Sequence, residues 1–275
     1  MPIIHAIVLG LTQGLSEFLP ISSSGHLLLV PWLFHWHDFA DTSVQKAFDA
    51  ALHLGTLLAV VVYFGKDLWV YVREGVRLVV KREKPGSPEG RLAWLLVLSA
   101  VPGAAAGALF EDKIDKHLGG PILTAISLIV FGLVLFWADR LTGDRTIEAF
   151  DKSDAIKVGA AQMLALNPGT SRSGITMTAA RWLGFTRDSA ARISFLMSVP
   201  IIGGAAVWKL AKLAKHGIPH GLGNALVVGV VTAAISGFIA VWGLLKLVRT
   251  RSLTPFVVYR VAAGILVLVV AAARG

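Results

Sequence analysis

Two apolar stretches, each broken by polar residues, decide the fold. The first, residues 3–34, reads IIHAIVLGLTQGLSEFLPISSSGHLLLVPWLF, and the second, residues 155–183, reads AIKVGAAQMLALNPGTSRSGITMTAARWL. A membrane-spanning helix needs about 20 continuous apolar residues, and neither stretch supplies them. Irregular backbone at membrane depth is tolerated where protein or a cavity covers it, so each stretch is predicted to form a re-entrant hairpin of two short helices. For residues 3–34 an ordinary first helix plus a loop stays open as the alternative.

The composition places both stretches in a membrane protein. The chain has 275 residues, of which 55% are hydrophobic and only 16% are charged. A soluble domain carries about 25% charged residues, so a water-soluble globular enzyme is excluded. The absence of cysteine excludes disulfides, thiolate metal sites and cysteine nucleophiles. We therefore predict an all-α integral membrane protein with one membrane domain over residues 1–275.

The chain also contains an internal repeat. An offset of 149 residues aligns 13–25 with 162–174 and matches five residue pairs, which are Gln13/Gln162, Leu15/Leu164, Ser22/Ser171, Ser24/Ser173 and Gly25/Gly174. Each copy is followed by three apolar segments, the first set being 48–72, 92–110 and 121–138 and the second 193–213, 222–247 and 255–273. Three crossings per unit place the second copy in the membrane from the other side. We expect an inverted-topology repeat, with repeat 1 at about 1–140 and repeat 2 at about 150–275, and a site near its interface.

The positive charge orients the chain. The net charge is +9, and 16 of the 26 basic residues lie in segments 73–91, 139–157, 181–192 and 246–251. Segments 35–49, 111–117, 209–220 and the tail hold 7. Basic loops favour the cytoplasm, so the first four segments are predicted inside and the N-terminus outside. The excess charge therefore implies no nucleic-acid partner.

Three ionisable residues in the broken stretches are the first candidates for function, because charges inside a membrane are expensive. They are Glu17, His26 and Arg172. The turn around Arg172 opens a helix, and such a turn points N–H groups at an anion while the guanidinium suits phosphate oxygens. Residues 22–25 form a similar serine turn, so two facing turns suit a ligand with two phosphates. Small residues also pack membrane helices, which stays open as the structural explanation.

Acid–base chemistry is the next inference. A carboxylate, an imidazole and a serine hydroxyl can together activate a nucleophile and protonate a leaving group. Glu17 could instead hold a divalent ion, with the amide oxygen of Gln13 one helical turn away. The sequence leaves these two roles unresolved. It also leaves His53 between a cavity residue and a buried structural histidine, and Arg260 between a phosphate clamp and a snorkelling side chain.

At these residues the chain resembles the bacterial undecaprenyl-diphosphatase (bacitracin-resistance) family. The resemblance lies in Gln13-x-x-x-Glu17-Phe-Leu-Pro-Ile-Ser-Ser-Ser-Gly-His26 and in Pro168-Gly-Thr-Ser-Arg-Ser-Gly-Ile-Thr176, and it extends over nearly the whole chain. It implies hydrolysis of undecaprenyl diphosphate to the monophosphate carrier of peptidoglycan synthesis, and bacitracin resistance. It also implies an inner-membrane location, an active site toward the outer face, and a divalent cation, Mg²⁺ or Ca²⁺.

The resemblance further implies residue roles. Glu17 is implied in catalysis or metal binding, Ser23 as nucleophile, His26 as acid–base partner and Arg172 as diphosphate clamp. Further implied substrate-binding residues are Gln13, Ser22, Ser24, Ser171, Ser173 and Thr176. Gln13 departs from the family pattern, because many members carry glutamate there, and this puts two-carboxylate metal coordination in doubt.

Two other functions compete with this reading. Inverted repeats with broken helices are typical of transporters, so a flippase for a polyprenyl-phosphate lipid is the alternative. A second class of membrane phosphatase has related serine and arginine motifs, but it needs a histidine downstream of Arg172, where this chain has Met177 and Thr178. The expected partners are a polyprenyl diphosphate, membrane lipids and, as an open question, a second copy of the chain.

Overall fold

The computed structural model describes residues 1–39, 42–81, 86–216 and 223–274, with side chains omitted at 42–43, 111–117 and 206–216. The described residues form helices, two 3₁₀ turns and no strand. The helices are α1 (Ile3–Phe18), α2 (Ser23–Phe34), α3 (Thr42–Tyr63), α4 (Gly65–Val80), α5 (Pro88–His117), α6 (Pro121–Asp139), α7 (Lys152–Gln162), α8 (Arg172–Trp182), α9 (Arg187–His216), α10 (Gly223–Val248) and α11 (Thr254–Arg274). The 3₁₀ turns are η1 (Ile147–Ala149) and η2 (Met163–Leu166). The prediction of an all-α protein is thereby confirmed for the described residues.

Five of the described helices are long and apolar enough to cross a membrane. They contain the segments Val44–Tyr63, Pro88–Phe110, Pro121–Asp139, Gly223–Val248 and Thr254–Arg274. The sixth expected span, 193–213, falls in α9, where side chains beyond residue 205 lie outside the description. It therefore stays a prediction, as does the outside placement of segments 111–117 and 209–220.

The expected span 48–72 is wrong in its extent. The helix ends at Tyr63, and a second helix begins at Gly65. Phe64 between them leaves helical geometry, with φ −95° and ψ 17°. Lys66 and Asp67 follow at once, and Asp67 in the first turn of α4 suits the positive end of that helix. The charges that interrupt the apolar run thus coincide with the break between the two helices.

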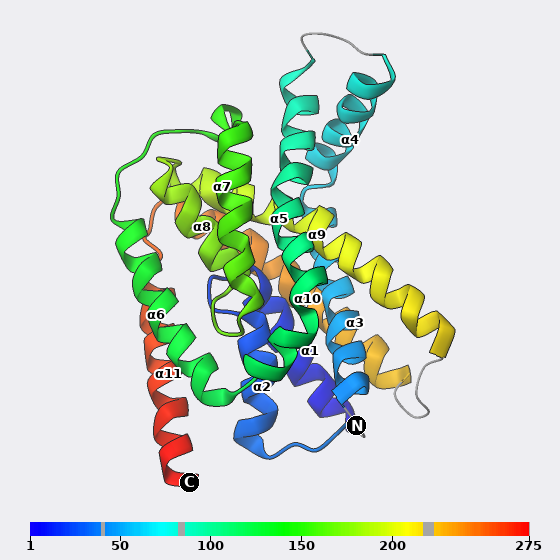
Figure 1. Ribbon diagram of the computed structural model, residues 1–275, viewed down its shortest axis with the longest axis vertical. Helices are drawn as coiled ribbons and strands as arrows, with labels where there is room; N and C mark the ends of the chain where they lie inside the picture. Colours follow the sequence, from blue (N-terminus) through cyan, green and yellow to red (C-terminus); the bar gives the residue numbers. More distant parts are fainter. Residues whose placement is uncertain (40–41, 82–85, 217–222, 275) are drawn as a thin grey trace.

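Both broken stretches form two short helices joined by a turn, as predicted. α1 and α2 are joined at residues 19–22, and α7 and α8 are joined through η2 and residues 167–171. The α1 helix packs against α10, α7 packs against α5, and α6 pairs with α11. Figure 1 shows α4 and the α6–α7 link at one end of the molecule, with the start of α1 and the end of α11 at the other. The two hairpin turns meet between these ends.

Small residues allow the close helix contacts that set this arrangement. A Cβ atom added at Gly14 would lie only 1.9 Å from the Ser236 hydroxyl of α10, and one at Gly10 only 2.6 Å from the Gly229 carbonyl. On the other side, a Cβ at Gly159 of α7 would lie 2.5 Å from the Ser99 carbonyl of α5. Such glycines let helix backbones approach one another, which is how membrane helices associate. The hairpins are therefore fixed against their neighbours.

Candidate active site

Each hairpin turn ends in a serine with the same unusual backbone. Ser22 has φ 80° and caps α2, and Ser171 has φ 73° and caps α8. Each hydroxyl accepts a hydrogen bond from a glycine N–H three residues on, Gly25 at 3.3 Å and Gly174 at 3.1 Å. Positive φ is uncommon outside glycine and concentrates at functional sites. The two cap hydrogen bonds offset part of this backbone strain, and they begin α2 and α8 with the same local geometry.

Direct hydrogen bonds connect the two turns. The Ser22 hydroxyl also accepts the Gly169 N–H at 3.1 Å, and the Ser173 hydroxyl donates to the Leu19 carbonyl at 3.0 Å. Ser171 and Ser173 share a hydrogen bond of 3.2 Å. Two of the serines expected to bind substrate, Ser22 and Ser173, therefore join the turns, while Ser171 bonds within its own turn.

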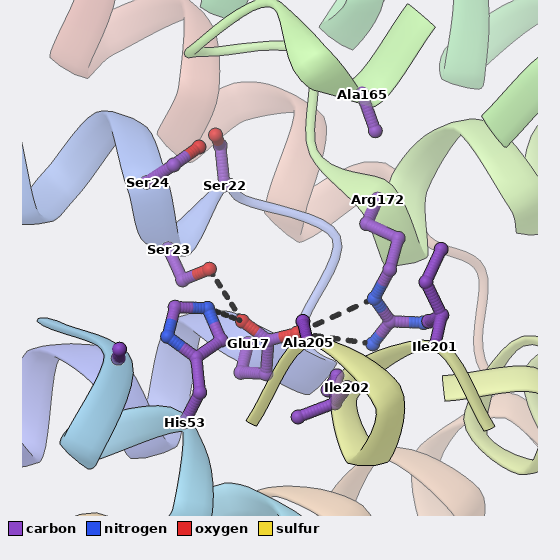
Figure 2. Close-up of a pocket in the computed structure, with 11 residues that line it drawn as sticks. Glu17, Ser22, Ser23, Ser24, His53, Ala165, Arg172, Ile201, Ile202 and Ala205 are labelled. Atoms are coloured by element: carbon purple, nitrogen blue, oxygen red, sulfur yellow. Dashed lines mark hydrogen bonds and ion pairs between the residues drawn. The ribbon is translucent and has the colours of Figure 1, made fainter. Parts of the chain in front are cut away.

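Glu17 is the centre of the polar cluster. Its Oε2 accepts hydrogen bonds from the Ser23 hydroxyl at 2.6 Å and from Nε2 of Gln13 at 3.2 Å. Its Oε1 accepts two from Arg172, Nε at 3.3 Å and Nη2 at 3.2 Å. Nε2 of His53 lies 3.6 Å from Oε2 (Figure 2). Residues from both broken stretches, with His53 from α3, thus surround one buried carboxylate.

These side chains line a cavity of about 230 Å³. Its polar walls are Glu17, Ser22, Ser23, Ser24, His53 and Arg172, and its apolar walls are Ala50, Ala165, Ile201, Ile202 and Ala205. A second cavity of about 710 Å³ shares Ser24 and His53 with the first. Its other walls include the basic side chains Lys46 and Arg274 and the apolar Leu27 and Leu28. The two cavities therefore border one another at Ser24 and His53, beside α2 and α3.

His26 lies away from this cluster. Its Nε2 is 2.7 Å from the hydroxyl of Tyr259, and its Nδ1 is 2.7 Å from the Ser22 carbonyl. It does not line either cavity. Thr176 also points elsewhere, since its hydroxyl donates to the Arg172 carbonyl and to Ser194. The structure thus brings together Glu17, Ser23 and Arg172 but not His26.

The histidine beside the carboxylate is His53. Its Nδ1 lies 2.7 Å from the Asp49 carbonyl, which turns Nε2 toward Glu17. The sequence offered a signal for it, an ionisable side chain within an apolar segment, but could not fix which face of α3 it occupies. The sequence contained no comparable signal for Ser194. Its carbonyl accepts Nη1 of Arg172 at 3.0 Å and so orients the guanidinium.

Arg260 takes neither of the roles considered for it. It is fully buried, so it does not snorkel, and it lines neither cavity. Its guanidinium donates instead to backbone carbonyls, among them Pro20 in the first turn and Gly169 in the second. A phosphate clamp at this position is therefore excluded in this conformation.

Glu17 and Gln13 offer part of a site for a divalent cation. Within the described residues no three His, Cys, Asp or Glu side chains gather as a metal site. The Gln13 amide oxygen is buried without a hydrogen-bond partner and belongs to the side chain that contacts Glu17. One carboxylate and one amide oxygen suit a hard cation that draws its remaining ligands from phosphate and water. The residues fit a substrate-borne ion better than a permanently held one.

The fold and the site define a helical membrane protein with a buried cluster of one carboxylate, serine hydroxyls and an arginine where two hairpins meet. Residues 6–266 match the model of the family described as "Bacitracin resistance protein BacA", and the chain belongs to this family. An undecaprenyl-diphosphatase of Geobacter sulfurreducens is 48% identical over 96% of each chain. Those of Moorella thermoacetica and Pelotomaculum thermopropionicum are 46% and 44% identical, over 98% or more of both chains.

Proposed function

We propose that this protein is an undecaprenyl-diphosphatase, which hydrolyses undecaprenyl diphosphate to undecaprenyl phosphate and inorganic phosphate. The product is the lipid carrier reused in peptidoglycan synthesis, and the activity confers bacitracin resistance. One observation carries the proposal: a hydroxyl, a carboxylate, an imidazole and a guanidinium converge on one cavity. A pure carrier of lipid phosphate needs an anion site but no acid–base group beside a hydroxyl. The family membership and the names of the relatives favour the same reading.

The first chemical step follows from the Ser23–Glu17 hydrogen bond. Glu17 takes the Ser23 proton while Oγ bonds to the terminal phosphorus of the diphosphate. The bond from that phosphorus to the bridging oxygen breaks, and undecaprenyl phosphate leaves. Water then hydrolyses the phosphoserine and releases inorganic phosphate. If Ser23 only orients a water molecule, the same carboxylate acts as base and the products are unchanged.

Arg172 supplies the positive charge that phosphoryl transfer requires. In the free protein its guanidinium binds Glu17, and diphosphate oxygens compete for the same N–H groups. Substrate binding therefore frees Glu17 to act as a base. Phosphoryl transfer depends mainly on positioning and on stabilising negative charge, and a planar guanidinium held by Ser194 does both.

His53 takes the acid–base role first expected of His26. Its Nε2 faces the same carboxylate oxygen as the Ser23 hydroxyl, so it can pass a proton to the leaving phosphate. Its position at the border of both cavities gives that proton a route to solvent. A divalent cation, Mg²⁺ or Ca²⁺, would neutralise diphosphate charge there, with the Gln13 amide oxygen and the Glu17 oxygen that does not receive the Ser23 proton as its protein ligands.

We also propose the inverted repeat and its orientation. The support lies in pairs of residues 149 positions apart that do the same thing: Ser22 and Ser171 cap helices at positive φ, and Gly10 and Gly159 admit close helix contacts. The contact of α1 with α10 corresponds to that of α7 with α5. The larger cavity lies beside residues 35–37 and Arg274, in segments predicted outside. In the inner membrane the active site would then face outward.

The function is tested by phosphate release. The purified protein in detergent receives undecaprenyl diphosphate, with and without divalent cation and chelator. We expect release of one phosphate per substrate and its loss in Arg172→Ala. A matched control is Arg192→Ala, which removes an arginine that pairs with Asp188 outside the cavity. No release by the intact protein, with translocation of the lipid in vesicles, would establish the flippase instead.

A further inference from the structure

Arg260 presents an unusual problem of charge. It lies in the apolar helix α11 and is 0% exposed. Burying a cation costs many kcal/mol unless hydrogen bonds or a counter-charge compensate it. Among the described residues no carboxylate pairs with it. Its compensation must therefore come from neutral oxygen atoms.

Five backbone carbonyls supply those oxygens. A guanidinium has five N–H donors, and those of Arg260 lie within hydrogen-bond distance of five carbonyl oxygens. The partners are Leu128 at 3.0 Å from Nε, Pro20 at 3.1 Å from Nη1, and Gly169 at 2.8 Å, Thr170 at 3.0 Å and Ser127 at 3.4 Å from Nη2. The two N–H groups of Nη2 are shared among three of these carbonyls, while Nε and Nη1 each donate to one.

These carbonyls belong to three separate parts of the chain. Pro20 lies in the first hairpin turn, Gly169 and Thr170 lie in the second, and Ser127 and Leu128 lie on α6. Two glycines make room for the side chain. A Cβ at Gly132 would lie 3.4 Å from Nε, and one at Gly174 would lie 3.0 Å from Nη1. One guanidinium therefore joins both turns to the α6–α11 pair.

We propose that Arg260 is a positioning residue, which sets the spacing between the two turns and thereby aims Arg172 at the phosphate beside Ser23 and Glu17. The inference rests on the proposed hydrolase function. It follows from the sequence distances involved: Pro20 is three residues from Ser23, and Thr170 is two residues from Arg172. Lysine cannot replace it, because an ammonium has three donors and no planar fork.

The test compares Arg260→Lys with Arg181→Lys. Arg181 is also buried, and it also donates to carbonyls, those of Leu141 and Phe185, which lie away from both turns. We expect Arg260→Lys to lower kcat about 100-fold, the loss caused by a misplacement of about 1 Å. We expect KM to change less than about 3-fold, because Arg172 and the cavity walls remain. Arg181→Lys should cost thermal stability in detergent but keep kcat within about 3-fold.

Two further variants guard against a folding defect. Gly132→Ala keeps Arg260 but crowds its Nε, and we expect a several-fold lower kcat at an unchanged melting temperature. Combining Arg260→Lys with Arg172→Lys should give less than the product of the two losses, whereas Arg181→Lys with Arg172→Lys should give the product. Equal kcat values for Arg260→Lys and Arg181→Lys, or a multiplicative loss with Arg172→Lys, would overturn the inference. A wild-type protein that releases no phosphate would instead refute the proposed function.

Discussion

The two hairpin turns have the same backbone but carry different chemistry. Ser22 and Ser171 cap their helices in the same way, and the next residue in each turn is the first of its helix, Ser23 in one and Arg172 in the other. These two residues are 149 positions apart, so they occupy the same place in the repeat. One turn offers a hydroxyl to the cavity, and the other offers a cation. Two turns with the same backbone thus present a hydroxyl and a cation to one cavity.

The largest expected effect comes from removing the carboxylate that both turns share. We expect Glu17→Gln to lower kcat about 1000-fold, because general base catalysis contributes between about 100- and 10,000-fold. The amide keeps the shape and can still contact Arg172. Phosphate release under saturating substrate measures the effect. A rate within about 10-fold of wild type would show that Glu17 is not the base.

Exchanging the two turn residues tests the comparison itself. The double variant Ser23→Arg/Arg172→Ser keeps the composition and both serine caps. We expect it to keep its melting temperature within a few degrees but to lose at least about 100-fold in kcat, the effect of losing one charge-stabilising donor. The reason is that Glu17 and His53 both belong to the first repeat, together with residue 23. Substantial hydrolysis by the exchanged protein would contradict the division of roles between the turns.

The next largest effects distinguish His53 from His26. We expect His53→Gln to lower kcat about 100-fold, as loss of an acid–base group does. His26→Gln should lower it less than about 10-fold, because His26 bonds to Tyr259 and Ser22 outside the cavity. Rates of both variants across a pH series provide the measurement. If His26→Gln proves the more damaging, the acid–base role returns to His26.

The smallest expected effects are losses of stability when the helix-capping serines, Ser22 and Ser171, are replaced. Loss of a serine cap costs about 1 kcal/mol of stability. Ser22→Ala should cost more than Ser171→Ala, because the Ser22 hydroxyl also accepts the Gly169 N–H of the opposite turn. Unfolding in mixed micelles gives the two free energies, and Ser22→Gly separates backbone strain from the lost hydrogen bonds. Equal losses would mean that the bond between the turns adds nothing.

The sequence predicted the hairpins because polar and glycine residues interrupt otherwise apolar runs. It also predicted that Glu17 and Arg172 would function, because charge within such runs is expensive. It placed His26 ahead of His53, because which of the two faces the carboxylate depends on the rotation of α2 and α3 about their axes. It could not predict the role of Arg260, because bonds to backbone carbonyls leave no residue pattern in a sequence. The sequence did contain a signal for the helix break at Phe64, the charges of Lys66 and Asp67, but the prediction placed them inside a single span.

The most direct test asks whether Ser23 and Arg172 serve one active site. Phosphate release from undecaprenyl diphosphate is measured for Ser23→Ala, Arg172→Ala and the double variant. Residues that act as a unit give strongly non-additive losses. We expect the double variant to retain about the same residual rate as the less active of the two single variants. A double-variant loss equal to the product of the two single losses would show that the turns act independently and would contradict a shared site.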